Sequence, residues 1–259
     1  MTEAEWMACV DPPPMLEYLV GRAGDRKFRL FAVECCRRVQ EHISDPRCRQ
    51  ALAILEENVG TDRYAPCFEL AASNARAVWH ERHYRVLASS VGDDLARRAA
   101  ATSTGTLTGL TDDATARAAT AKAESDPIVR AASAVWVAAG AGSPTENEDF
   151  ASYRAEIAAE HAARACGNEG IEKLHQVRLL RDIFGNPFLP VPVDPRWLTE
   201  TTATLATGIY ADRAFDRMPI LADALEEAGC DNRDMLDHCR GDGPHVRGCW
   251  VVDLLLGKV

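Results

Sequence analysis

The chain has 259 residues, 47% of them hydrophobic and 26% charged, which is typical of a globular protein long enough to bury a real core. Its formal net charge of -10 repels phosphate backbones at long range, so we expect no nucleic-acid partner. The apolar runs are far shorter than the roughly 20 residues of a membrane span, and no secretory signal opens the chain, so we expect a cytoplasmic protein without membrane contact.

Helix start signals begin at Thr2 and Glu5, which have capping-box spacing. The clearest helix spans about Arg26 to Ile43. Its apolar arc includes Cys35 and Cys36, so we interpret both thiols as core residues and the opposite arc as a solvated face. That charged arc consists of Arg26, Lys27, Glu34, Arg37, Arg38 and Glu41. The alternatives are a redox or metal role for the thiols, and a basic binding patch from Arg22 to Arg38.

A second long helix is predicted from about Pro66 to Leu87, with His80 and His83 at its surface. From about residue 95 to 165 the chain is rich in alanine, which favours helix but buries little area. Loops are expected at Thr102–Thr111 and Gly140–Pro144. Within this region Asp126-Pro127 marks a helix start, because proline in the first turn loses no hydrogen bond.

Residues 186 to 195 contain four prolines, which exclude helix and favour an extended strap. An amphipathic helix, a short helix from about Asp231 to Arg240 and a terminal helix ending at Leu256 follow. The sequence therefore predicts an all-α fold, an irregular multi-helix stack or bundle. We divide it into an N-terminal helical part (1–94), an alanine-rich middle (95–165) and a C-terminal part with the strap (166–259), which form one continuous globular unit.

Two stretches carry a resemblance to a known family. The opening TEAEWMACVDPPPMLEYL with DRKFRLFAVECCRRV, and the closing LLRDIFGNPFLPV with HCRGDGPHVRGCWVVDLLLGKV, resemble an uncharacterised family of helical bacterial proteins of planctomycete type. The resemblance covers roughly the first 50 and the last 85 residues, and it implies no established activity.

The helix openings DPIVRAA from Asp126 and GPHVRGC from Gly243 resemble those of HEAT-like repeats, and DPRCRQAL from Asp45 does so more loosely. Their spacing follows no fixed period, whereas a solenoid should show a period of roughly 30 to 47 residues. We therefore expect an irregular helical stack and not a regular repeat protein.

One group of residues near the C-terminus could carry chemistry. Cys230, His238, Cys239, His245, Cys249 and Asp253 lie close together in the sequence. We expect His245, Cys249 and Asp253 to form one stripe on the terminal helix, because they follow each other at intervals of four. A short turn would bring His238 and Cys239 to the same corner.

Three interpretations of this corner compete. In a structural one, Cys249 packs as a small apolar group and Asp253 pairs with an arginine. In the second, Cys239, His245 and Cys249 bind zinc, with Cys230 or His238 as the fourth ligand; thiolate and imidazole suit zinc, although no C-x-x-C knuckle is present. In the third, Cys249 is a nucleophile, His245 its base and Asp253 the orienting acid.

The residues from Val246 to Leu256 cover nearly the whole circumference of the predicted terminal helix with apolar side chains, so that helix must be enclosed by its own domain or by a partner. Our first hypothesis is a non-enzymatic helical module for protein–protein association or scaffolding, self-association into a homo-oligomer included. The second is a small zinc-binding regulatory protein. Enzyme activity is not favoured, because phosphate-loop and hydrolase motifs are missing, and zinc is the one cofactor considered.

Overall fold

We describe a computed structural model, which defines residues 1–59, 66–101, 120–140 and 149–258. Over these ranges the chain forms helices joined by turns and extended segments, without a strand, and the predicted all-α class is confirmed. The loop predicted at Thr102–Thr111 and nearly all of the one at Gly140–Pro144 lie outside the described residues. Within the described part of the chain, no helix combines the length and the apolar character that a membrane span requires.

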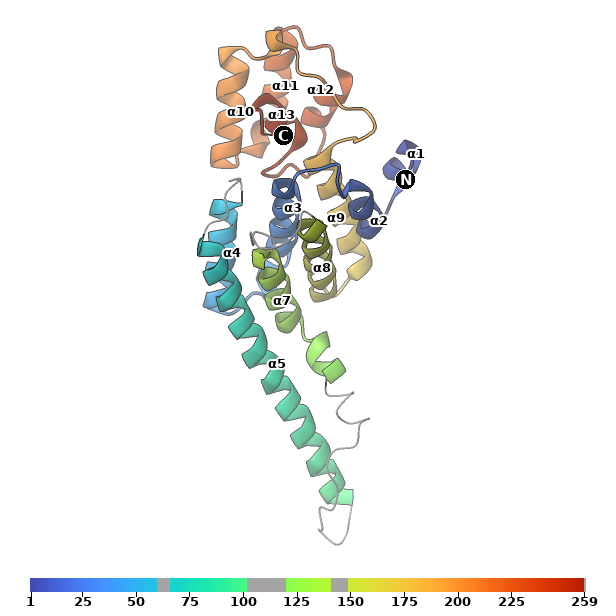
Figure 1. The fold of residues 1–259 in the computed structure, drawn as a ribbon, viewed down its shortest axis with the longest axis vertical. Helices are drawn as coiled ribbons and strands as arrows, with labels where there is room; N and C mark the ends of the chain where they lie inside the picture. The colour runs from blue at the N-terminus through green and yellow to red at the C-terminus, as the bar shows by residue number, and fades with distance from the viewer. Residues whose placement is uncertain (60–65, 102–119, 141–148, 259) are drawn as a thin grey trace.

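The chain builds a helical body, a connecting strap and a C-terminal module. In Figure 1 the module lies above the body, and the strap runs along one side of the module. The body comprises α1 (Glu3–Ala8), α2 (Pro12–Leu19), α3 (Asp25–Arg38), the 3-10 helix η1 (Gln40–His42), α4 (Pro46–Asn58), α5 (Pro66–Ala101), α7 (Pro127–Gly140), α8 (Asp149–Ala165) and α9 (Glu169–Phe184). The strap, residues 185–194, contains no helix, as predicted, but it makes a turn at Pro187 and Phe188 before it runs on to Asp194. The last proline of the predicted extended stretch, Pro195, begins a 3-10 helix instead. The C-terminal module, residues 195–258, comprises η2 (Pro195–Trp197), α10 (Glu200–Asp212), η3 (Phe215–Arg217), α11 (Met218–Glu227), α12 (Arg233–Arg240) and α13 (Trp250–Leu255).

The central helix of the body is α3, which is buried on nearly all sides. Cys35 and Cys36 are fully buried in it, as the apolar arc predicted. Both thiols have a pKa above the usual range, first of all because burial disfavours the thiolate. Helices α7 and α8 pack against α3 and against each other through alanines, and these small side chains let the helix axes approach closely. The buried alanines of this layer are Ala131, Ala132, Ala134, Ala138, Ala139, Ala151, Ala155, Ala158, Ala159 and Ala162.

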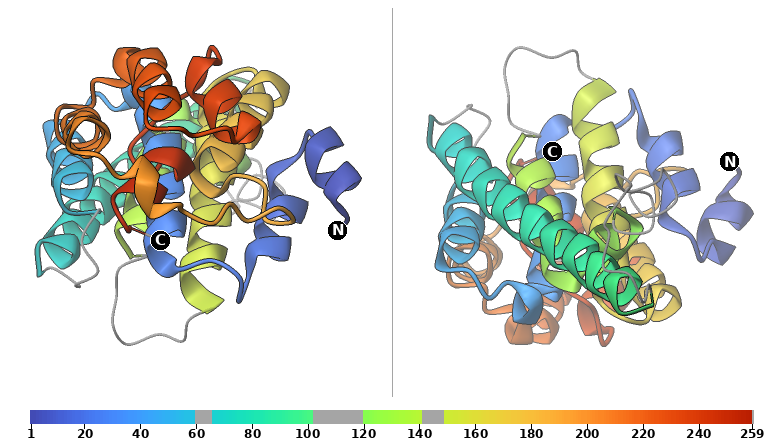
Figure 2. Two further views of the ribbon diagram at one scale, coloured as in Figure 1. Left: turned by 90° about the horizontal axis from the view of Figure 1, so that it is seen from above. Right: turned by 90° about the horizontal axis from the view of Figure 1, so that it is seen from below.

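Several helix starts follow the predicted chemistry. Thr2 and Glu5 form the predicted capping box of α1. The carboxylate of Asp126 accepts hydrogen bonds from the backbone N–H groups of Ile128 and Val129, which fixes the first turn of α7 behind its proline. Helix α5 is longer than the sequence predicted; it crosses the underside of the body and projects beyond it (Figures 1 and 2).

The terminal helix differs from its prediction. It begins only at Trp250, with Cys249 as its N-cap residue, and the preceding residues form turns. Its apolar side chains Val251, Val252 and Leu255 are buried inside the C-terminal module. Because the module itself encloses this helix, the helix gives no reason to expect a partner, and association stays a prediction.

The interface between the body and the C-terminal module is rich in charged groups. Arg26 at the start of α3 forms a bidentate ion pair with Asp253 of α13, with N–O distances of 2.6 and 3.1 Å. The Arg26 guanidinium also donates to the Tyr210 hydroxyl at 3.1 Å. The prediction that Arg26 and Glu34 lie on a solvated face was therefore wrong, because both are buried. The module covers Arg26 at the start of α3, whereas Glu34 lies in the second half of the helix and is paired with Arg37. The pairing of Asp253 with an arginine is confirmed.

Candidate metal centre

The candidate site lies where the end of α9 meets the module. Asp182 stands in the last turn of α9 and is 2% exposed. Its neighbours Leu180 and Ile183 are part of the body core, so their burial places the Asp182 carboxylate at the edge of that core. Gly185 ends the helix with a φ of 68°, a left-handed conformation that a residue with a Cβ rarely adopts.

The module contributes three side chains from three consecutive segments. His238 comes from the last turn of α12, His245 from the following loop, and Cys249 from the N-cap position of α13. His245 and Cys249 therefore do not share one helix face, which corrects the predicted stripe with Asp253. The turn after α12 nevertheless brings both histidines together, with ring centroids 4.8 Å apart.

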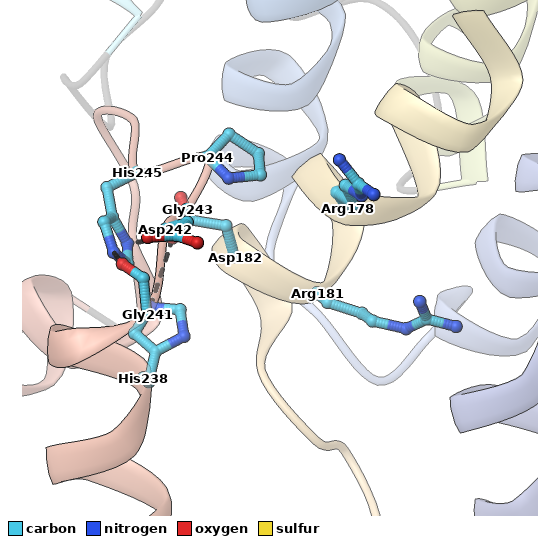
Figure 3. Close-up of a pocket in the computed structure, with 9 residues that line it drawn as sticks. All are labelled: Arg178, Arg181, Asp182, His238, Gly241, Asp242, Gly243, Pro244 and His245. Atoms are coloured by element: carbon cyan, nitrogen blue, oxygen red, sulfur yellow. Dashed lines mark hydrogen bonds and ion pairs between the residues drawn. The ribbon is translucent and has the colours of Figure 1, made fainter. Parts of the chain in front are cut away.

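Four side chains converge at this corner. Asp182 Oδ1 lies 3.1 Å from His238 Nε2 and 3.0 Å from His245 Nδ1, and the Cys249 Sγ lies 3.1 Å from the same His238 nitrogen. One donor atom from each of the four residues lies within 4.8 Å of the other three. Figure 3 shows the Asp182 carboxylate directed between the two imidazole rings.

Outer contacts hold two of these groups in place. The backbone N–H of Val246 donates to Asp182 Oδ2 at 3.0 Å, which leaves Oδ1 directed toward the histidines. His245 Nε2 lies 3.3 Å from the carbonyl oxygen of Gly241. A proton on Nε2 would satisfy that carbonyl and leave Nδ1 with a free lone pair, the arrangement that metal-binding histidines in proteins normally have.

The protonation of this corner follows from its contacts. Burial alone would lower the pKa of His245, but the hydrogen bond and the charge of Asp182 outweigh it and raise this pKa above its usual value. Burial, together with the charge of Asp182, raises the pKa of the Cys249 thiol well above its usual value. A bound metal would therefore have to displace the proton of the Cys249 thiol.

The remaining predicted ligands lie outside this group of four. Cys239 is fully buried, and burial raises the pKa of its thiol to about 12. Cys230 is 4% exposed within the module core. The predicted nucleophilic arrangement is not formed either, because the Cys249 sulfur contacts His238 and not His245, while Asp253 is held by Arg26.

Asp182 is the member that the sequence analysis missed. It lies 63 residues before His245, and no motif connects the two. The available signal was an acid between the apolar residues Leu180 and Ile183 of an amphipathic helix. Burial of a carboxylate there is unfavourable unless a partner compensates its charge, so such a partner could have been expected.

A cavity of about 240 Å³ opens beside Asp182 and the two histidines. It is bounded by the loop 241–244 and by the side of α9 that carries Arg178 and Arg181. The Arg181 guanidinium donates to the backbone carbonyls of Trp6, Met7 and Cys9, so it anchors α1 and is turned away from the histidines (Figure 3).

Comparison with models of protein families, with curated protein sequences and with solved structures found no match. The resemblance to a bacterial family therefore stays a prediction, and functional inference depends on the site itself.

Proposed function

We propose that this protein is a small zinc-binding regulatory protein, in which Asp182, His238, His245 and Cys249 coordinate one ion. The observation that carries the proposal is the convergence of four donor atoms of the right chemistry within 4.8 Å. Tetrahedral zinc with bonds of about 2.0–2.3 Å places its ligand atoms about 3.3–3.8 Å apart. To admit the ion, the observed 3.0–3.1 Å contacts would lengthen slightly, and the wider separations of up to 4.8 Å would shorten.

The donor set favours zinc over the hard cations. A thiolate and two imidazoles suit a borderline-soft ion, whereas calcium and magnesium prefer oxygen ligands. The thiolate and the carboxylate together would neutralise the charge of the ion, which matters because Asp182 and Cys249 are buried. The hydrogen bonds from Val246 and to Gly241 supply the outer contacts that such a site needs.

The position of the ligands suggests what the ion would do. Asp182 belongs to the body, whereas the other three residues belong to the module. An ion bound to all four would connect the two parts, and its loss would weaken the attachment of the module. Metal availability would in this way regulate how firmly the module is held.

The test is the metal content and stability of purified protein. We expect about one zinc ion per chain after equilibration with zinc and removal of excess, and a lower melting temperature after chelation. Cys249→Ser should bind fewer than about 0.2 ions per chain. The matched control is Cys239→Ser, which alters a neighbouring buried thiol outside the four-residue group and should retain the ion.

Two results would refute the proposal. The first is wild-type protein that holds fewer than about 0.2 ions per chain and melts at the same temperature with and without chelator. The second is unchanged zinc content in Cys249→Ser. Association with a protein partner, with self-association included, stays a prediction beside this proposal.

A further inference from the structure

A second cavity lies at the junction of body, strap and module, with a lining that excludes all four candidate metal ligands. Its volume is about 640 Å³, within the range of about 300–1,000 Å³ that small-molecule sites usually have. Apolar side chains form most of its wall: Tyr18, Leu19, Phe184, Val191, Trp250 and Leu254.

The wall of this groove is preformed. Gly185 lies against the Trp250 ring, and a Cβ at position 185 would stand 3.1 Å from Trp250 Cγ, so the bare backbone allows the indole to pack here. Pro187 and Pro190 restrict the strap that borders the groove. A ligand would therefore meet an existing surface and would not have to order it.

Lys27 lines the groove, and its ammonium has hydrogen-bonding capacity to spare. Its ammonium donates to the carbonyl oxygen of Ile183 at 2.8 Å, and the described residues offer it neither another hydrogen bond nor a carboxylate within 4.0 Å. Asp253, the acid with the largest electrostatic effect on Lys27, is engaged by Arg26. Burial lowers the pKa of Lys27, which reflects how incompletely this ammonium is compensated.

Two other charged residues line the groove. Arg22 is exposed, donates to the Tyr18 carbonyl at 2.7 Å and lies 4.4 Å above the Tyr18 ring, so it adds a second cation beside an aromatic wall. The acid of the lining is Asp234, which is exposed. The charge of the groove thus favours an anion, and its surface favours an apolar body.

We propose that this groove binds a small carboxylate with an apolar body, an aliphatic or aryl acid. The carboxylate would accept hydrogen bonds from the ammonium of Lys27, and the apolar portion would lie along Tyr18, Phe184 and Trp250. This site is independent of the metal centre, and neither proposal needs the other.

Calorimetry with decanoate and the uncharged 1-decanol tests the proposal on the full chain. We expect one decanoate to bind per chain, and we expect Lys27→Met to weaken it about ten- to a hundredfold, because a charge-assisted hydrogen bond is lost while the apolar stem remains. Lys122→Met, at an exposed lysine that precedes α7 and does not line the groove, is the matched control and should bind like wild type. Decanol should bind wild type and Lys27→Met equally.

A second pair of variants covers the case in which Lys27→Met does not fold. Gly24 also lines the groove; it is the N-cap of α3 with a φ of -75°, and a Cβ there meets no atom within 4 Å. Asp and Asn are both favoured N-caps, so Gly24→Asp and Gly24→Asn should fold alike and differ mainly in charge. Gly24→Asp should bind decanoate more weakly than Gly24→Asn does, with no difference for decanol.

The proposal fails if decanoate shows no saturable binding to wild type up to about 5 mM. It also fails if decanoate binds folded Lys27→Met as tightly as wild type. Where Lys27→Met does not fold, equal affinity of decanoate for the two Gly24 variants overturns it.

Discussion

The alanine layer of α7 and α8 and the interface between body and module are stabilised in opposite ways. The layer has little apolar area per residue and gains its stability from the number of small side chains that allow close helix packing. The interface depends on a few directed contacts, among them the ion pair of Arg26 with Asp253 and the network around Asp182.

The two arrangements should therefore fail in different ways. A tightly packed layer of small residues tolerates lost volume better than added volume, because an extra side chain has no space to occupy. An interface of buried charges is sensitive to the loss of one partner, because the other is left buried and uncompensated.

The largest effect is expected at the interface. Asp253→Ala should lower the free energy of unfolding by about 3–5 kcal/mol, because it leaves the Arg26 guanidinium buried without its carboxylate. Urea denaturation measures this. The control is Asp223→Ala, which removes one of the two acids that Arg240 contacts at the surface and should lower the stability far less. Equal losses in the two variants would contradict the contrast between interface and surface.

An intermediate effect is expected in the alanine layer. Ala134 is fully buried in α7, and Ala134→Leu should lower the free energy of unfolding by about 1–3 kcal/mol, since the added atoms must displace a neighbouring helix. Ala53→Leu makes the same change on the exposed side of α4 and should stay within about 0.5 kcal/mol of wild type. A similar small effect at both positions would mean that the layer is loosely packed.

The same contrast separates what the sequence could predict from what it could not. Periodicity correctly placed Cys35 and Cys36 in the core, and the proline density correctly excluded helix from residues 185–194, because both signals are local. The burial of Arg26 was not predictable in this way. The local pattern of α3 predicts that Arg26 is exposed to solvent. A segment far along the chain, α13, covers it and supplies its partner Asp253.

The candidate site shows the same limit. The sequence brought His238, His245 and Cys249 to one corner because they are close along the chain. It placed His245 and Cys249 on one helix, but the backbone turns before Trp250 and the helix begins after them. Asp182 was missed because its approach depends on how α9 packs against the module, which no local pattern encodes.

The smallest effect concerns His161, which lies in α8 of the alanine layer. Burial lowers the pKa of His161, and the nearby Arg130 and Arg164 act in the same direction, against Glu160 and Glu124. His245 shows the opposite shift, because Asp182 accepts its hydrogen bond.

For His161 the unfolded chain binds the proton more readily than the folded protein, so this residue makes the free energy of unfolding fall as the pH drops through about 6.5 toward the lowered folded-state pKa. His161→Gln removes the contribution. Urea midpoints of wild type and variant at about pH 7.5 and about pH 5.5 measure it, and the variant should lose less stability over this interval. An identical loss in both proteins would show that the imidazole is already well compensated, and that the alanine layer accommodates charge as readily as the interface does.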